Sequence, residues 1–305
     1  MYNQNDARSA LIPAAGTGPA AAAAAPEYIQ FDLADPAEVS AAGSPTWYFR
    51  GQNFVLAYTR LRAGDTLDRR EQHHEYLLLL TALDSDVDIT AGADRATVTE
   101  PAVVVVPPGP SSLTAGRDTA VVRLFDGRTG DLMDKAANAG SYTVPHANVT
   151  PLVPWPDPVD GDRLRVYLTE RIPPETGRFG RIFRTSAFMI NFLELQQGPR
   201  DPEQLSPHHH DNFEQCSLAV EGSYMHHIRT PWTTKRSEWR EDQHTRVGSP
   251  SVAIIPPPTV HTSEAVGPAR NQLIDIFCPP RADFSAREGW VLNAAEYPGR
   301  SEVAS

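Results

Sequence analysis

Two segments of the chain repeat one pattern, and this repeat constrains the fold more than any other feature. Residues 103–112 and 252–261 match position for position, as an apolar strand followed by a proline corner. Each segment is followed by a further apolar strand, at 120–125 and at 272–277. A repeat on this scale indicates two copies of one structural unit within the 305 residues.

Strand character dominates the rest of the sequence. Apolar or alternating runs such as 164–168, 188–195 and 251–255 are separated by Gly, Pro and Asp at short intervals. No long amphipathic helix stands out, so we predict an all-β protein with two tandem barrels. The expected parts are a flexible alanine-rich tail (1–26), an N-terminal barrel (27–140), a proline-rich linker (141–162) and a C-terminal barrel (163–305).

The C-terminal copy carries a group of candidate metal ligands. Alternate side chains of a strand share a face, so His208 and His210 point to one side while His209 points away. Glu214 follows the bend into the next strand, where it can face the same pocket, and His261 stands after the proline corner. Three imidazoles and one carboxylate suit a divalent transition metal, so we predict one such ion per chain.

This arrangement resembles the cupin family, whose motifs read Gly-x5-His-x-His-x3or4-Glu-x6-Gly and Gly-x5-Pro-x-Gly-x2-His-x3-Asn. The four candidate ligands match the ligand positions of the two motifs. The turns match less well, because seven residues rather than six separate Glu214 from Gly222, Pro258 replaces a glycine, and Ala265 stands at the asparagine position. The resemblance implies two tandem cupin barrels, each a double-stranded β-helix or jelly roll, an arrangement called a bicupin.

The N-terminal copy lacks the ligand set. Ser112 aligns with His261, and Arg69 and Glu71 align with the two histidines of the first motif. His73 and His74 are nearby and restore a site only if the alignment slips. Because a borderline metal needs the missing imidazoles, we expect the chemistry in the C-terminal copy. The N-terminal copy is then a structural or dimerising barrel, and we expect a homo-oligomer.

The family resemblance implies a function. Cupin dioxygenases hold Fe(II), and related cupins hold Mn(II) or Ni(II), so the main hypothesis is oxidative cleavage by O2 of a small metal-chelating compound. A phenolic acid, a flavonol-like enol or a diketone fits this description, with Glu214 as ligand or general base. The same ligands also serve a non-redox lyase, decarboxylase, isomerase or hydrolase. A third hypothesis is a non-catalytic cupin that binds a small molecule.

Strand alternation nominates the residues of the substrate pocket: Asn191 or Phe192, Cys216, Leu218, Tyr224, and Asp275 or Phe277. Ten extra residues between the two C-terminal motifs fall within 230–246 and form a lid, an arm on a partner barrel, or a solvated hairpin.

Composition bounds the partners. The formal charge of −11 argues against nucleic acid, and no apolar run approaches the ~20 residues that span a bilayer. Only two cysteines are present, which suits a reducing cytoplasm. We therefore expect a cytoplasmic protein with a small-molecule substrate.

Overall fold

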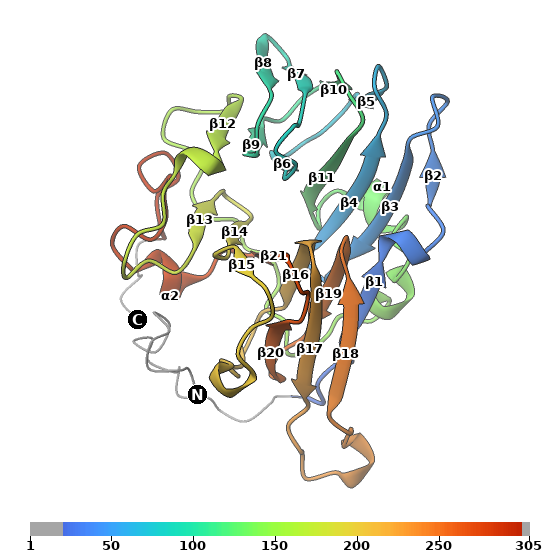
Figure 1. Ribbon diagram of the computed structural model, residues 1–305, viewed down its shortest axis with the longest axis vertical. Helices are drawn as coiled ribbons and strands as arrows, with labels where there is room; N and C mark the ends of the chain where they lie inside the picture. The colour runs from blue at the N-terminus through green and yellow to red at the C-terminus, as the bar shows by residue number, and fades with distance from the viewer. Residues whose placement is uncertain (1–20, 301–305) are drawn as a thin grey trace. The chain divides into compact units, whose positions relative to one another are not determined.

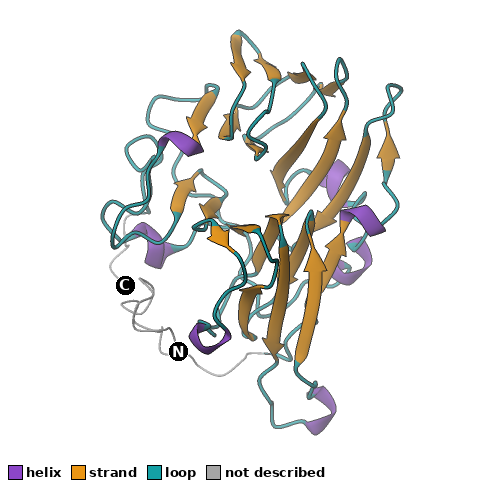
Figure 2. Ribbon diagram, viewed as in Figure 1, coloured by secondary structure: helices purple, strands orange, loops and turns teal. Residues whose placement is uncertain are grey.

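The structure is a computed structural model that describes residues 21–300. These residues divide into two compact units of antiparallel strands. The N-terminal barrel unit holds residues 35–141, 155–173 and 293–300, and the C-terminal barrel unit holds residues 21–34, 142–154 and 174–292. Strands dominate and helices are short (Figure 2), so the prediction of an all-β protein is confirmed.

The N-terminal barrel unit contains one large and one small sheet. Across the large sheet the strands are β12 (Arg165–Leu168), β9 (Ala102–Val106), β6 (Tyr76–Leu80), β11 (Thr119–Asp126), β4 (Phe54–Leu61), β3 (Pro45–Arg50) and β2 (Glu38–Val39). Across the small sheet they are β5 (Thr66–Arg69), β10 (Ser111–Ala115), β7 (Val87–Ala91) and β8 (Asp94–Val98). Leu78, Leu113 and Phe125 belong to one apolar core to which both sheets contribute.

The C-terminal barrel unit repeats this plan. Its large sheet runs β1 (Glu27–Gln30), β19 (Ser251–Ile255), β16 (Gln215–Glu221), β21 (Arg270–Phe277), β14 (Met189–Phe192) and β13 (Arg181–Arg184), and β15 (Gln196–Gln197) also pairs with β21. Its small sheet runs β18 (Gln243–Gly248), β17 (Ser223–Arg229) and β20 (Val260–Ala265) (Figure 1). β16, β19 and β21 correspond to β6, β9 and β11, as the sequence repeat predicts.

Helical segments are a single turn or little more. They are α1 (Gly130–Met133), α2 (Ala282–Ser285), and the 3-10 turns η2 (Phe31–Leu33), η3 (Ala139–Tyr142), η4 (Thr169–Arg171), η5 (Pro202–Gln204) and η6 (Arg236–Glu238). Among the helices of residues 21–300, none has the length and apolar character needed to cross a membrane.

The units differ from the predicted boundaries at their edges. β1 pairs with β19, which places residues 27–34 in the C-terminal barrel unit, and β12 pairs with β9 of the N-terminal barrel unit. An edge strand leaves backbone groups unpaired, and each large sheet pairs one edge with a segment from the other half of the sequence. The predicted tail lies mostly outside the described residues, but the Ala21 N–H within it donates to Asn148 Oδ1 at 3.1 Å.

The ten extra residues fall in the β17–β18 hairpin, whose tip is formed by residues 230–242 (Figure 1). Trp232 and Trp239 stack there with ring centroids 4.3 Å apart and planes 7° apart. Trp239 Nε1 also donates to the Thr233 carbonyl at 2.8 Å, so the tip is ordered by its own side chains.

One corner of the C-terminal barrel unit depends on a glycine. Asn271 is fully buried, and its Nδ2 donates to the Gly198 and Gly267 carbonyls at 3.0 Å while its Oδ1 accepts from the Ser223 N–H at 3.1 Å. Gly222 has φ +86°, and a Cβ there would lie 2.2 Å from Asn271 Oδ1. Gly222 is therefore required both by its backbone conformation and by the close approach of Asn271.

We predict that Gly222→Ala lowers the free energy of unfolding by about 2–4 kcal/mol, from left-handed strain plus disruption of the buried Asn271 hydrogen bonds. Gly198→Ala is the matched control, because Gly198 also has positive φ (+73°) but a Cβ there would lie 3.9 Å from the Pro268 carbonyl oxygen. The control should lose only about 1 kcal/mol in urea unfolding. Equal losses for the two variants would show that Asn271 does not matter.

Candidate metal centre

Three of the predicted ligands meet in the C-terminal barrel unit. His208, His210 and His261 are buried, and each offers a ring nitrogen within 4.8 Å of the others. His208 and His261 form an antiparallel bridge in which the N–H of each donates to the carbonyl of the other, at 3.0 and 2.7 Å. This bridge joins the loop before β16 to the start of β20, so backbone pairing holds two of the imidazoles in place.

Backbone carbonyls set the tautomers of two of these rings. Nδ1 of His208 lies 2.9 Å from the Ser206 carbonyl, and Nδ1 of His261 lies 3.0 Å from the Thr259 carbonyl. A carbonyl only accepts, so we assign the proton to each Nδ1, which leaves a lone pair on each Nε2. Nε2 lone pairs are what a metal ion requires.

The third ring, His210, is held by aromatic packing. It stacks on Phe213 with centroids 4.4 Å apart and meets the edge of Phe277 at 5.9 Å. Burial, together with the charge of Arg281, lowers the pKa of His210 well below its ordinary value. The ring is therefore neutral at physiological pH, as a metal ligand must be.

Gln215, the first residue of β16, lies beside the histidines, where Glu214 was predicted to lie. Its Oε1 lies 2.9 Å from Nε2 of His210 and 3.3 Å from Nε2 of His261. Its Nε2 donates to Ser217 Oγ and to Asp275 Oδ1, both at 3.0 Å. These two bonds fix the orientation of the amide, so the Gln215 oxygen faces the imidazoles.

Glu214 lies outside the histidine group. Its buried carboxylate accepts a hydrogen bond from the Tyr142 hydroxyl at 3.1 Å, and Nδ1 of His146 lies 3.6 Å from the same oxygen. The sequence already contained the signal for this difference, because six residues separate Gln215 from Gly222, as the cupin motif requires. A slip of one residue exchanges the two faces of a strand.

The donor set fits a divalent cation. With the His261 proton on Nδ1, its Nε2 lone pair faces the Gln215 oxygen, which is also an acceptor, at 3.3 Å. Two acceptors repel at this distance unless a positive charge lies between them. Three imidazole nitrogens and one amide oxygen would hold such an ion, and further positions on it would stay open to a substrate.

The one-residue shift from Glu214 to Gln215 also explains which of the predicted pocket residues line the cavity. Tyr224 and Asp275 line the cavity beside His208, whereas Asn191, Cys216 and Leu218 are fully buried and are not among its lining residues in the described chain. Counting alternation from Glu214 selected the wrong face of β16. Burial and the neighbouring carboxylates raise the pKa of the Cys216 thiol, so this side chain is a small neutral hydrophobe.

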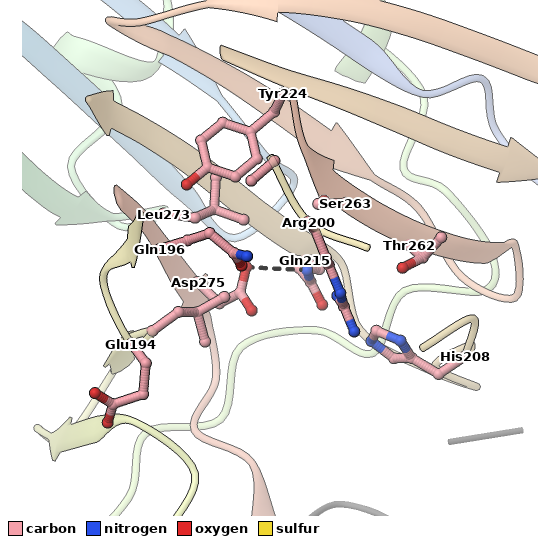
Figure 3. A pocket seen from close by; sticks show the side chains of 12 residues that line it. Glu194, Gln196, Arg200, His208, Gln215, Tyr224, Thr262, Ser263, Leu273 and Asp275 are labelled. Atoms are coloured by element: carbon pink, nitrogen blue, oxygen red, sulfur yellow. Dashed lines mark hydrogen bonds between the residues drawn. The ribbon is translucent and has the colours of Figure 1, made fainter. Parts of the chain in front are cut away.

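Figure 3 shows the side chains that line the cavity. Its volume is about 80 Å³. The sequence analysis did not identify several lining residues, because they come from loops or from polar positions without a motif. They are Glu194, Gln196, Arg200, Thr262 and Ser263. Arg200 is the lining cation, and its Nη2 donates to the Gln204 carbonyl at 2.7 Å and to Ser206 Oγ at 3.0 Å. The Ser206 carbonyl also hydrogen-bonds His208 Nδ1, so Ser206 positions both Arg200 and one of the candidate metal ligands.

Solved structures show which fold this is. An oxalate decarboxylase from Lactobacillus farciminis in complex with formate superposes with TM-score 0.56 at 13% identity, over 83% of this chain and 86% of that one. Oxalate decarboxylase from Bacillus subtilis at pH 4.6 gives 0.55 at 14% identity, over 83% and 76%. The chain has the bicupin fold.

An IolB-like protein from Salmonella typhimurium gives TM-score 0.50 at 11% identity, over 80% of this chain and 92% of that one. No family model matches the sequence, and no curated protein matches it. At these identities the likeness concerns the fold of this bicupin and not its activity.

The N-terminal barrel of the bicupin has no equivalent group. Within residues 21–300, the three histidines are the one cluster of His, Cys, Asp or Glu with metal-ligand spacing. Arg69 pairs with Ser111 as His208 pairs with His261, so Ser111, rather than the predicted Ser112, occupies the position of His261. Neither serine replaces an imidazole as a ligand for a borderline metal.

We predict that Gln215→Ala weakens the affinity for a divalent metal by about 10–100-fold, because the amide is the fourth donor and supports His210 and His261. Glu214→Gln should leave that affinity unchanged, since its carboxylate bonds Tyr142 instead. Titration calorimetry with Mn(II) on both variants measures the difference. The reverse order of effects would return Glu214 to the metal.

Proposed function

We propose that the C-terminal barrel is a metal-dependent lyase, decarboxylase or isomerase that uses a divalent ion as a Lewis acid. The observation that carries this proposal is the ligand set, in which the neutral Gln215 amide joins three neutral imidazoles. A bound divalent ion would supply positive charge that stabilises negative charge developing on a substrate oxygen. With no anionic ligand, its full charge acts on the substrate.

The likeness to solved structures favours the non-redox hypothesis over the dioxygenase hypothesis. Oxalate decarboxylases are among the solved structures that share this fold. Loss of CO2 from a carboxylate leaves negative charge on the substrate, which a Lewis acid stabilises. The non-redox hypothesis, which the sequence analysis held as the alternative, is therefore the one we propose.

The substrate we propose is a small carboxylic acid. A cavity of about 80 Å³ fits a molecule of a few heavy atoms better than a flavonol-like ring system. Arg200 lines the cavity and is already oriented by Gln204 and Ser206, so its planar guanidinium can bind a carboxylate with little loss of entropy. The likeness to oxalate decarboxylase structures supports this class of substrate.

Two carboxylates line the cavity in different environments. Asp275 is buried, and its Oδ1 accepts from Ser217 Oγ and Gln215 Nε2, so its role is to orient the amide. Glu194 lines the same cavity but is exposed to solvent. We assign to Glu194 the transfer of a proton between the substrate and water, because an exposed carboxyl group exchanges its proton readily.

We predict full turnover of a small mono- or dicarboxylic acid without oxygen. The experiment loads the protein separately with Mn(II), Fe(II) and Ni(II), then screens small acids, diketones and phenolic acids in an anaerobic chamber and with an oxygen electrode. Substrate loss without O2 consumption supports the Lewis-acid proposal. Turnover that stops under anaerobiosis would establish the dioxygenase instead.

Two variants separate catalysis from folding in this assay. His261→Ala should abolish turnover in a folded protein, because each barrel has its own apolar core. Arg200→Ala should raise KM by about 10–100-fold, the range for hydrogen bonds to a charged group, with Arg270→Ala as its control. Arg270 pairs with Glu221 on the surface and does not line the cavity.

A further inference from the structure

The interior of the N-terminal barrel carries a positive group where the C-terminal barrel carries a negative one. Tyr76 pairs with Val106 as Gln215 pairs with Ile255, so Tyr76 stands in the position of Gln215. Two residues further along these strands, Arg123 pairs with Leu78 as Asp275 pairs with Ser217. Arg123 therefore replaces the buried carboxylate that orients the metal-site amide.

Arg123 is a buried charge without an ion pair. Its residue is 6% exposed, and within residues 21–300 its Nε has no hydrogen-bond partner and no carboxylate forms an ion pair with its guanidinium. Burial raises the pKa of Glu38, whereas hydrogen bonds from Lys135 and Tyr48 and the charges of Lys135 and Arg123 lower it. The Tyr48 hydroxyl hydrogen-bonds with Arg123 and donates to one Glu38 oxygen at 2.5 Å, while Lys135 Nζ donates to the other at 2.8 Å, so Glu38 reaches Arg123 only through Tyr48.

Hydroxyl groups and aromatic rings surround the same region. The guanidinium carbons of Arg123 and Arg69 lie 5.7 and 5.5 Å from the centroid of Phe125, on which Tyr76 stacks at 4.7 Å. The Tyr76 and Ser111 hydroxyls share a hydrogen bond at 3.0 Å, and either can donate. Their mutual bond uses one of the two hydroxyl hydrogens, and the other remains available to an acceptor. A buried cation, one hydroxyl donor and flat aromatic rings are the elements of an anion site.

We propose that the interior of the N-terminal barrel binds a small carboxylate anion through Arg123, with the Tyr76–Ser111 hydroxyl pair as one additional donor. The charge balance selects the ligand. Arg69 is already neutralised by Asp131 at 2.6 Å, so one unpaired positive charge remains, which suits a monoanion better than a phosphate dianion. The planar guanidinium and the aromatic rings likewise match a planar carboxylate better than a tetrahedral oxyanion.

The test uses acetate as the probe and metal-free Arg200→Ala protein as the background, in which the C-terminal cavity should bind a carboxylate about 10–100-fold more weakly. Calorimetry at constant ionic strength should detect acetate in this background, and adding Arg123→Met should weaken its affinity by at least about 10-fold. Adding His261→Ala instead should leave the affinity unchanged, because that residue belongs to the other barrel. Inorganic phosphate, titrated in parallel, should bind more weakly than acetate.

A second readout separates an anion site from a structural arginine. Replacing a buried charge by methionine of similar size is often neutral or stabilising, so Arg123→Met should unfold at the same or a higher temperature without acetate. If this variant is insoluble, or less stable than the background, Arg123 is structural and the proposal fails. Tyr76→Phe, which removes one hydroxyl, should weaken acetate binding while the protein stays folded.

Other outcomes would also overturn the proposal. Acetate affinity that survives Arg123→Met, or that disappears with His261→Ala, would place the bound anion elsewhere. Tighter binding of phosphate than of acetate would contradict the carboxylate class. The experiment is independent of the proposed catalytic function, because its readouts are binding and thermal stability rather than turnover.

Discussion

The orientation of the Gln215 amide is the interaction on which the candidate site depends. Ser217 and Asp275 bind its nitrogen, and its oxygen is thereby directed at His210 and His261. Without Asp275 the amide could turn over and present N–H groups to the imidazoles, which would repel a cation. The buried Asp275 carboxylate thus acts on the site through its hydrogen bond with the Gln215 amide. It is not itself a candidate ligand, so it adds no negative charge to the ligand set.

The two barrels use one strand pattern for two kinds of interior. Equivalent pairs of β6, β11 and of β16, β21 carry Arg123 in one barrel and Asp275 in the other. Each buried charge then calls for a different partner, because an unpaired charge inside a barrel is costly. In the C-terminal barrel hydrogen bonds from Gln215 and Ser217 satisfy the carboxylate. In the N-terminal barrel the aromatic rings and hydroxyls carry no negative charge, so the anion that we propose would neutralise Arg123.

The sequence alone predicted the architecture, and it predicted that three histidines come together, for physical reasons. Fully buried strands such as β9 and β19 appear as continuous apolar runs, and the proline corner marks where His261 follows. The sequence analysis did not predict that Gln215 rather than Glu214 faces the histidines, because residues 211–214 bend between His210 and β16, and strand alternation cannot be counted across a bend. Arg200 and the pairing of β1 with β19 were not predicted either, since long-range contacts leave no local pattern.

An anomalous-difference map from crystals of the metal-loaded protein would locate the ion directly. We expect one peak per chain, about 2.0–2.2 Å from the ring nitrogens of His208, His210 and His261 and near the Gln215 oxygen. A peak bonded to Glu214, a second peak beside Ser111, or no peak at the three histidines after loading would contradict this expectation.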